Sequence, residues 1–322
     1  MQSPYLGTSF HAVDGVVSGV QALAAPLAGS VVTIGAFDGV HRGHQALLTR
    51  AADLARAEGV PAVAFTFHPH PAKVLAPARA PALIVSVEER ARLLLAHGMD
   101  RVVVQPFDEA FARVSADAFV RDFLAGPLRP RHVVVGFNFA YGQGRAGNRA
   151  TLEAAGHELG FGVDVVGPVD VGGVVCSSTR VRERLLEGDV AGAARLLGRA
   201  PFLTGQVVPG DQRGRTIGFP TANVDPEPEL LPCAGVYATR VSWDGEPARP
   251  SVTNIGNRPT FGGGHVTVEV HLLDFSGDLY GRRLRVELVG RLRDERRFEG
   301  RDALVAQLNQ DVASARAVLG DR

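Results

Sequence analysis

Lysine is almost absent from this sequence. Of the 34 basic residues other than histidine, only Lys73 is a lysine, so arginine carries nearly all of the positive charge. A Walker A phosphate-binding loop needs a lysine directly after its last glycine, and a protein kinase needs a lysine on a strand that faces the phosphates. Lys73 lies in neither context. Any nucleotide phosphates must therefore be bound by arginine, histidine, backbone N–H groups or a metal ion.

The sequence also contains few cysteines and has no formal net charge. Cys176 and Cys233 are the only cysteines and form no C-x-x-C pair, which excludes a disulfide framework and a cysteine-rich zinc site and favours a reducing cytoplasm. The 34 basic residues balance 34 acidic residues. A protein that binds nucleic acid through its phosphates should carry a basic excess, so we expect no nucleic-acid partner.

Long apolar runs are interrupted. Gly15–Phe37 carries no charge over 23 residues, which is long enough to cross a bilayer. Four glycines, Pro26 and several polar residues break this stretch, and no lysine or arginine precedes it, as a signal peptide would require. We predict a short helix, a loop and a buried strand here, and no membrane segment.

The length of 322 residues suggests about two domains. In the first part, short apolar runs alternate with helical patterns, one of which begins at a capping box formed by Ser86 and Glu89. The predicted helices cover residues 41–58, 86–97, 116–124 and 178–186. The predicted strands are Val31–Ile34, Ala62–Phe67, Arg101–Gln105, His132–Gly136 and Gly162–Val166. This alternation is typical of a Rossmann-like α/β domain with a doubly wound parallel sheet, which binds ligands at the carboxyl ends of its strands.

The pattern changes after about residue 200. Strand-like runs separated by turn residues follow Phe202, and a helical pattern covers about Asp302–Val318. The clearest runs are Gly235–Val241, Ser251–Asn254, Val266–Leu273 and Arg283–Leu292. We predict a small antiparallel β-barrel with a terminal helix. The predicted organisation is a first domain over residues 15–187, a linker over 188–201 and a second domain over 202–322.

A glycine-rich turn follows the first predicted strand. Gly35 and Gly39 allow a ligand to approach the backbone closely, and the turn leads into a helix whose free N–H groups favour phosphate. His41 and His44 are three residues apart, so they share one face of the first helical turn. Two imidazoles there could hydrogen-bond phosphate oxygens and stabilise charge during transfer. Two surface histidines would be the plain alternative, and Asp38 could be either a helix cap or a nucleotide contact.

The first domain resembles the nucleotidylyltransferase superfamily. More specifically, it is similar to the adenylyltransferase half of bacterial bifunctional riboflavin kinase/FMN adenylyltransferases, also called FAD synthetases. The resemblance rests on G-x-F-D-G-x-H-x-G-H at Gly35–His44, T-F-x-P-H-P at Thr66–Pro71, the segment Gly136–Gly142, and S-S-T-x-x-R at Ser177–Arg182. Many relatives carry an acidic residue where this chain has Asn138. The asparagine side chain keeps a hydrogen-bond acceptor but lacks the negative charge.

This resemblance implies three groups of residues in the first domain. His41, His44 and Arg182 would act in catalysis. The nucleotide would contact Gly35, Phe37, Asp38, Gly39, Ser178 and Thr179. The flavin would contact Phe67, Pro69 and Asn138. His68 and His70 have a metal-like spacing, but zinc needs three or four converging ligands and no cysteine supports them.

The segment Gly214–Asn223 reads G-R-T-I-G-F-P-T-A-N and resembles the riboflavin kinase signature. Thr221 and Asn223 point to the same side of an extended stretch, and their oxygens are hard donors suited to Mg²⁺. An ordinary turn with two polar residues is the alternative. The resemblance implies that Gly214, Arg215 and Gly218 bind the nucleotide.

Glu269 lies on the polar side of the alternating run Val266–Leu273. A glutamate in such a strand is commonly just solvated. The resemblance instead implies that Glu269 is the base that accepts the proton of the riboflavin 5′-hydroxyl. It also implies that Arg297 and Phe298 contact the flavin.

The resemblance, which covers most of the chain, implies a bifunctional enzyme. The barrel would phosphorylate riboflavin with ATP and Mg²⁺, giving FMN and ADP, and the first domain would adenylylate FMN to FAD with release of pyrophosphate. Three alternatives stay open: a chain with one working half, a non-catalytic flavin-binding module, and a tRNA-acting relative. The last would need a lysine-rich second motif, which one lysine cannot supply. The sequence also leaves open whether the chain forms a homo-oligomer.

Overall fold

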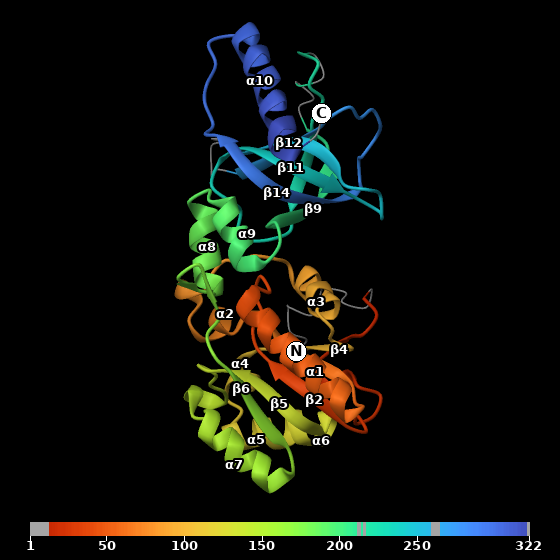
Figure 1. Ribbon diagram of the computed structural model, residues 1–322, viewed down its shortest axis with the longest axis vertical. Coiled ribbons are helices and arrows are strands. Elements are labelled where there is room, and N and C mark those ends of the chain that lie inside the picture. The colour runs from red at the N-terminus through yellow and green to blue at the C-terminus, as the bar shows by residue number, and fades with distance from the viewer. Residues whose placement is uncertain (1–12, 211–213, 215–216, 259–264, 321–322) are drawn as a thin grey trace. The chain divides into compact units, whose positions relative to one another are not determined.

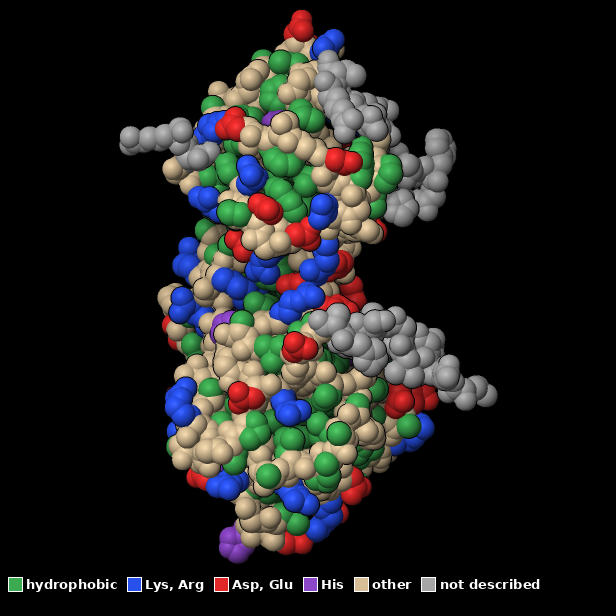
Figure 2. Space-filling model, turned by 90° about the vertical axis from the view of Figure 1, so that its right-hand side faces the viewer, with side chains coloured by type: hydrophobic (Ala, Val, Ile, Leu, Met, Phe, Trp, Pro, Cys, Tyr) green, Lys and Arg blue, Asp and Glu red, His purple; other side chains and the backbone are tan. Residues whose placement is uncertain are grey.

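The computed structural model describes residues 13–210, 214, 217–258 and 265–320 (Figure 1). The chain divides into two units: the first holds residues up to Ala82 together with Ser86–Cys176, and the second holds Leu83–Val85 and the chain from Ser177 onward. On the face shown in Figure 2, acidic and basic side chains lie interspersed. Across the residues described, none of the helices has both the length and the apolar character that a membrane span requires.

A six-stranded parallel sheet lies at the centre of the first unit. Its strand order is β1-β4-β3-β2-β5-β6, so the chain runs outward from β2 through β3 to β4 and then returns to the other side of β2. The strands are β1 (Val16–Ser18), β2 (Ser30–Ile34), β3 (Ala62–His68), β4 (Arg101–Pro106), β5 (Pro130–Gly136) and β6 (Gly162–Val166). The predicted doubly wound sheet is confirmed. Its order reverses between β2 and β5, where such sheets bind ligands.

These strands form because their side chains are buried on both faces of the sheet. In β2, Val32 and Ile34 belong to one apolar core and Val31 and Thr33 are buried on the opposite side. Such continuous apolar runs are typical of parallel sheets covered by helices. The predicted strands appear with their bounds shifted by at most two residues, and the uncharged stretch 15–37 forms β1, a short 3₁₀ turn (Val20–Ala22) and β2.

Helices cover the sheet of the first unit. They are α1 (Arg42–Glu58), α2 (Pro71–Leu75), α3 (Val87–Ala96), α4 (Glu109–Ala112), α5 (Ala116–Ala118), α6 (Gly126–Leu128) and α7 (Arg149–Leu159). A π-helical turn (Phe119–Ala125) joins α5 to α6, where the sequence predicted one helix over 116–124. A two-stranded hairpin, β7 (Asp170–Val171) and β8 (Val174–Val175), follows β6.

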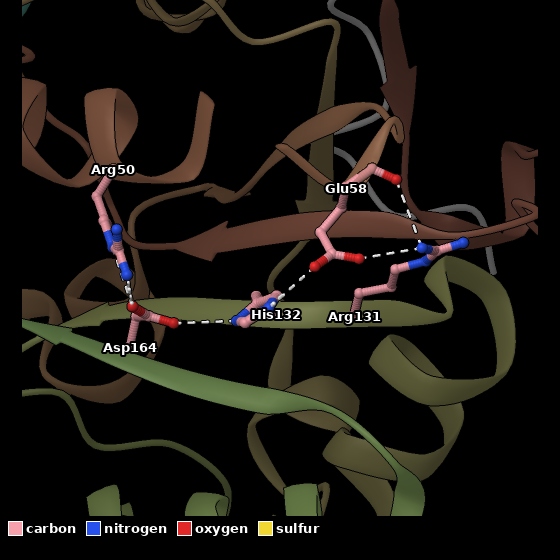
Figure 3. A network of polar contacts seen from close by, with 5 residues as sticks. All are labelled: Arg50, Glu58, Arg131, His132 and Asp164. Atoms are coloured by element: carbon pink, nitrogen blue, oxygen red, sulfur yellow. Dashed lines mark hydrogen bonds and ion pairs between the residues drawn. The ribbon is translucent and has the colours of Figure 1, made fainter. Parts of the chain in front are cut away.

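A chain of polar contacts ties α1 to the sheet (Figure 3). Arg50 Nε donates to Asp164 at 2.9 Å, Asp164 contacts His132 Nδ1 at 3.1 Å, and Arg131 Nη1 donates to Glu58 Oε2 at 3.0 Å. Burial acts to raise the pKa of Asp164, but hydrogen bonds from Arg50 and His132 outweigh it, so this pKa lies below its usual value. Because these side chains are partly exposed, each contact should add at most about 1 kcal/mol to stability.

A closed antiparallel barrel forms the main part of the second unit. Its order is β10-β13-β12-β11-β14-β9, which confirms the predicted barrel. The strands are β9 (Phe202–Val208), β10 (Ala222–Pro226), β11 (Gly235–Ser242), β12 (Arg249–Arg258), β13 (His265–Leu272) and β14 (Arg283–Arg293). The sequence did not single out β9, because Gly205 interrupts its pattern. This strand closes the barrel between β14 and β10.

In the described part of the second unit the α-helices are α8 (Ser178–Leu186), α9 (Val190–Leu197) and α10 (Arg301–Leu319). The segment predicted as a linker, 188–201, contains α9, whose Val190 joins the barrel core. The predicted domain boundaries remain predictions, but this segment is packed rather than extended. The terminal helix α10 lies on the outer face of the barrel, where Ala315 and Leu319 pack against Val236 and Val252 (Figure 1).

Candidate nucleotide and flavin sites

The turn after β2 has an unusual backbone. Phe37 and Val40 have φ values of 51° and 43°, and Gly39 has 78°. These left-handed positions delay the start of α1 until Arg42, so His41 is its N-cap and accepts a hydrogen bond from the His44 N–H at 3.4 Å. Asp38 is therefore not the helix cap, one of the two roles considered for it; its side chain is buried at 2% exposure.

The two histidines of this turn lie together, as their spacing predicts. The rings of His41 and His44 stack with centroids 3.7 Å apart. A Cβ atom on Gly43 would lie only 3.0 Å from the His41 ring, so glycine permits this packing. Burial, then the neighbouring His41 and Arg90, hold the pKa of His44 well below 6.5. His44 is therefore neutral at pH 7 and can offer phosphate a hydrogen bond rather than a charge.

One ring nitrogen of His44 has no protein partner. His44 Nδ1 is buried and makes no hydrogen bond within the described part of the chain. A buried polar nitrogen without a partner is costly unless a ligand satisfies it. With its proton on Nδ1, this imidazole fits an anionic oxygen, as the prediction of a phosphate site requires.

The ends of β3 and β5 lie beside this turn in the sheet. Thr66 Oγ1 donates to the Ala36 carbonyl at 3.2 Å, which joins the second predicted segment to the first. Pro69 is buried, and His70 caps α2 by accepting from the Ala72 N–H at 3.2 Å. Asn138 follows β5 and is exposed. His70 thus has a structural role that explains its presence without a metal.

Phe67 belongs to a cluster of aromatic rings that sequence reasoning did not find. Its ring contacts Phe107 at 5.7 Å and Phe111 at 6.0 Å between centroids. Phe107 directly follows β4 and Phe111 lies on α4, and no motif marks either residue. Together they form an apolar wall at the carboxyl end of β3, which suits a planar aromatic ligand.

The S-S-T-x-x-R motif lies on α8 in the second unit. Ser177 caps this helix by accepting from the Arg180 N–H at 3.2 Å, as predicted for the start of a helix. Ser178 and Arg182 are half-buried, and Thr179 is exposed. The motif therefore presents hydroxyl groups and an arginine at a helix N-terminus, a combination that binds anions.

A cavity of about 260 Å³ lies in the second unit between the outer face of the barrel and α10. Leu304, Leu308 and Val312 of α10 provide an apolar wall. Four of the predicted site residues line the same cavity: Gly214, Thr221, Glu269 and Phe298. The structure thus brings together residues from three distant parts of the sequence, whereas Arg215 lies outside the described residues and Gly218 does not line the cavity.

Glu269 stands in the middle of a polar row across three strands. It pairs with Asn223 on β10 and with Asn254 on β12. Paired residues share a face, and Val268 and Val270 point into the core, so this row faces outward. Glu269 and Asn254 line the cavity. Thr221 lines the cavity with Glu269, whereas Asn223 shares the outward face of the row without lining the cavity. The hydroxyl and amide oxygens of Thr221 and Asn223 are of the hard type that Mg²⁺ prefers.

The far side of the cavity is held by a buried ion pair that the sequence did not reveal. Arg293 at the end of β14 binds both oxygens of Asp311, with Nε–Oδ1 at 2.9 Å and Nη2–Oδ2 at 2.7 Å. Asp311 lies on the apolar stripe of α10 and is only 3% exposed. In the sequence, the one feature that could have indicated this ion pair is the position of the acidic Asp311 on the apolar stripe of the terminal helix.

The arginine beside Phe298 differs from the predicted one. Arg296 lies over the Phe298 ring at 4.9 Å and lines the cavity. Arg297 is exposed and does not line it. Arg293 and Arg296 are thus the guanidinium groups at this end of the cavity.

Comparisons with known proteins match each part of the chain to a family model. A family model described as FAD synthetase matches residues 24–180, and a model described as riboflavin kinase matches residues 197–319. The chain therefore joins an α/β unit of the FAD synthetase type to a barrel of the riboflavin kinase type. It belongs to the family of bifunctional riboflavin kinase/FMN adenylyltransferases, as the sequence motifs predict.

Several relatives place the chain in that family. The protein of this name from Escherichia coli strain K12 is 42% identical over 95% of this chain and 98% of its own. The protein of this name from Pseudomonas fluorescens is 42% identical over 94% of this chain and 97% of its own. The one from Bacillus subtilis strain 168 is 37% identical over 89% of this chain and 91% of its own. A crystal structure named as a macrolide-efflux protein from Streptococcus pneumoniae superposes with a TM-score of 0.83, at 32% identity, over 94% of this chain and 98% of that one.

Proposed function

We propose that this chain makes both flavin cofactors in the cytoplasm. Its barrel phosphorylates riboflavin with ATP to give FMN and ADP, and its α/β unit transfers AMP from ATP to FMN to give FAD and pyrophosphate. The observation that carries this proposal is the near full-length similarity to relatives that bear both names. The clustering of Thr221, Glu269 and Phe298 around one cavity supports it.

In the barrel, Glu269 acts as the base. Its carboxylate accepts the proton of the riboflavin 5′-hydroxyl while that oxygen bonds to the γ-phosphorus of ATP, and the bond from this phosphorus to the bridging oxygen breaks to release ADP. Thr221 and Asn223 hold Mg²⁺, which neutralises phosphate charge when bound. Phe298 and Arg297 contact the flavin, with Arg296 lying over the Phe298 ring, and Gly214, Arg215 and Gly218 contact the nucleotide.

In the adenylyl transfer, a phosphate oxygen of FMN bonds to the α-phosphorus of ATP and pyrophosphate leaves. No covalent bond to the protein forms. His41 and His44 donate hydrogen bonds to phosphate oxygens. Arg182, Ser178 and Thr179, which lie on α8 of the second unit, are the proposed ligands of the departing pyrophosphate. Phe67, Pro69 and Asn138 contact the flavin. Positioning and hydrogen bonding supply the acceleration.

Two substitutions test the assignment of one reaction to each unit. Glu269→Gln should lower FMN formation from riboflavin by a factor on the order of 10²–10⁴, since it removes the base, and leave FAD formation from supplied FMN intact. His44→Ala should do the reverse. Chromatographic separation of riboflavin, FMN and FAD after incubation with ATP and Mg²⁺ measures both. If either substitution silenced both reactions in a folded protein, the assignment would be wrong.

A further inference from the structure

Arg90 is a buried arginine that no motif marks. It lies on the buried face of α3, next to Val87, Ala91 and Leu94, and only 2% of its surface is exposed. Arginine is rarely buried to this extent unless its guanidinium is paired or hydrogen-bonded. The sequence places this arginine on an apolar stripe, which indicates a specific internal partner.

The partners of Arg90 are two backbone carbonyls in two predicted ligand-binding segments. Its Nη1 donates to the Ala36 carbonyl at 2.8 Å, and its Nη2 donates to the Phe67 carbonyl at 2.8 Å. Ala36 belongs to the turn that leads to His41 and His44. Phe67 belongs to the T-F-x-P-H-P segment. A single planar group thus joins residues that are 31 positions apart in the sequence.

Arg90 acts where the pairing of β2 with β3 ends. The register of the two strands runs to Ile34 and Phe65, and the Gly35 N–H still donates to the Phe65 carbonyl at 3.1 Å. The next carbonyls, those of Ala36 and Phe67, are bridged by the guanidinium. Arg90 therefore continues the connection between β2 and β3 past the last backbone hydrogen bond of their ladder.

The turn that Arg90 holds does not have a relaxed backbone. Phe37 and Val40 are non-glycine residues with positive φ, a conformation that persists only when the surroundings determine it. In the trans Ala36–Phe37 peptide, the carbonyl and the N–H point in opposite directions. Binding of the Ala36 carbonyl by Arg90 thus turns the Phe37 N–H away from the helix α3.

The charge of Arg90 is also present in the folded protein. Burial lowers its pKa to about 10, and Asp38 and then Glu88 oppose that effect. Arg90 is therefore protonated at neutral pH, and the buried Asp38 of the same turn is its principal acidic neighbour. The arginine thus acts on the turn through two hydrogen bonds and through this charge.

We propose that Arg90 is a positioning residue for adenylyl transfer, one that sets the distance between the His41–His44 turn and the Phe67 segment. This inference rests on the proposed function of the α/β unit. Arg90 touches carbonyl groups of the protein and not the substrates. Its effect is to fix the two segments in the arrangement in which nucleotide and flavin are brought together.

Three variants of the full chain test this proposal: Arg90→Met, Arg90→Lys and Arg92→Met. Methionine fills the apolar part of the site but binds neither carbonyl, and lysine keeps the charge and can bind one of them. Arg92, two residues away on α3, is half-exposed and pairs with Glu89, so its replacement by methionine is a matched control. Riboflavin phosphorylation by the same molecules reports that the barrel unit is intact, and hydrogen exchange of α1 peptides reports whether the α/β unit is folded.

We expect Arg90→Met to lower kcat/KM for FAD formation from FMN by a factor on the order of 100, with kcat lowered as well as the KM for ATP raised, because reacting groups are displaced. Arg90→Lys should recover part of this loss, and Arg92→Met should match wild type. Folded Arg90→Met with more than a third of wild-type kcat would overturn the proposal. If Arg90→Met does not fold, Arg90→Lys decides: unchanged kcat and KM overturn the proposal, and a loss in both supports it. Absence of FAD formation by wild type would instead contradict the proposed function.

Discussion

His44 is partly buried and its Nδ1 atom is enclosed by the protein, whereas the motif suggests two exposed histidines. His41 and His44 were predicted to share one face of a helical turn, and their stacked rings confirm this. The burial of His44 is not visible in the motif, and it has a chemical consequence. The lowered pKa makes His44 a neutral hydrogen-bond donor, so His44 itself offers a phosphate no positive charge.

The lowered pKa of His44 predicts a dependence of stability on pH. The unfolded chain protonates this histidine below about pH 6.5, whereas the folded α/β unit keeps it neutral. Folded stability due to this group is therefore complete above pH 6.5 and is lost as the pH falls. Between pH 7.5 and 5.5 the free energy of unfolding of the α/β unit should therefore fall, and His44→Gln should lack this fall.

Hydrogen exchange of peptides from α1, followed by mass spectrometry at both pH values, measures this difference. Fluorescence of Trp243, the single tryptophan, reports the barrel unit and serves as the control. Its unfolding should show the same pH dependence in both proteins. Equal pH dependence of α1 exchange in wild type and His44→Gln would contradict the assignment of a neutral, buried His44.

At the scale of elements, the barrel site depends on how α10 is attached. Apolar contacts from Ala315 and Leu319 hold the end of the helix on the barrel. The pair Arg293–Asp311 attaches its middle to the end of β14, directly before the Phe298 segment. The same pair that anchors the helix thus also determines where one wall of the cavity lies.

Asp311→Asn should therefore affect both stability and flavin binding. Removal of the charge leaves Arg293 partly unpaired, which should lower the free energy of unfolding of the barrel unit by about 2 kcal/mol. The KM for riboflavin should rise roughly tenfold, because the Phe298 segment shifts, while FAD formation from FMN is unchanged. Trp243 fluorescence in urea and initial rates measure these effects. Asp302→Asn, an exposed position on α10, is the control; an equal effect there would contradict a specific role for Asp311.

At the scale of the whole molecule, two units carry two reactions linked by one intermediate. FMN is the product of the barrel and the substrate of the α/β unit under the proposed function. Each unit has its own apolar core. A substitution that inactivates one site should therefore leave the other site working.

A mixture of two inactive variants tests this independence. Glu269→Gln alone should make no FAD from riboflavin, and His44→Ala alone should stop at FMN. Mixed with ATP and Mg²⁺, they should form FAD after a lag, because FMN released by one molecule is used by the other. Chromatography over time measures this lag. Accumulation of FMN without FAD in the mixture would show that the two variants do not complement each other.

Much of the fold could be predicted because it depends on local patterns. Continuous valine-rich runs indicated the parallel strands, and alternation in Val266–Leu273 indicated a barrel strand with Glu269 on its outer face. β9 and the packed helix α9 were missed. A strand containing glycine, or a short helix between two domains, has weak local preference and forms through packing against the rest of the unit.

Some candidate site residues could be predicted from the sequence and others could not, again because only local patterns can be recognised there. Motif positions such as His41, His44, Thr221 and Glu269 could be located because a short segment contains the chemistry. Arg90, Phe107 and Asp311 could not, because each acts through partners far away in the sequence.

The amino-acid sequence by itself determined the two fold types and the family and marked the segments predicted to carry the chemistry, since motifs and hydrophobic periodicity are local patterns. Only the tertiary structure decided that His41 caps α1, that His44 is neutral, that Arg296 lines the barrel cavity, and that Arg90 joins two segments. Burial and hydrogen-bond partners arise when distant segments pack together, and no local pattern contains them.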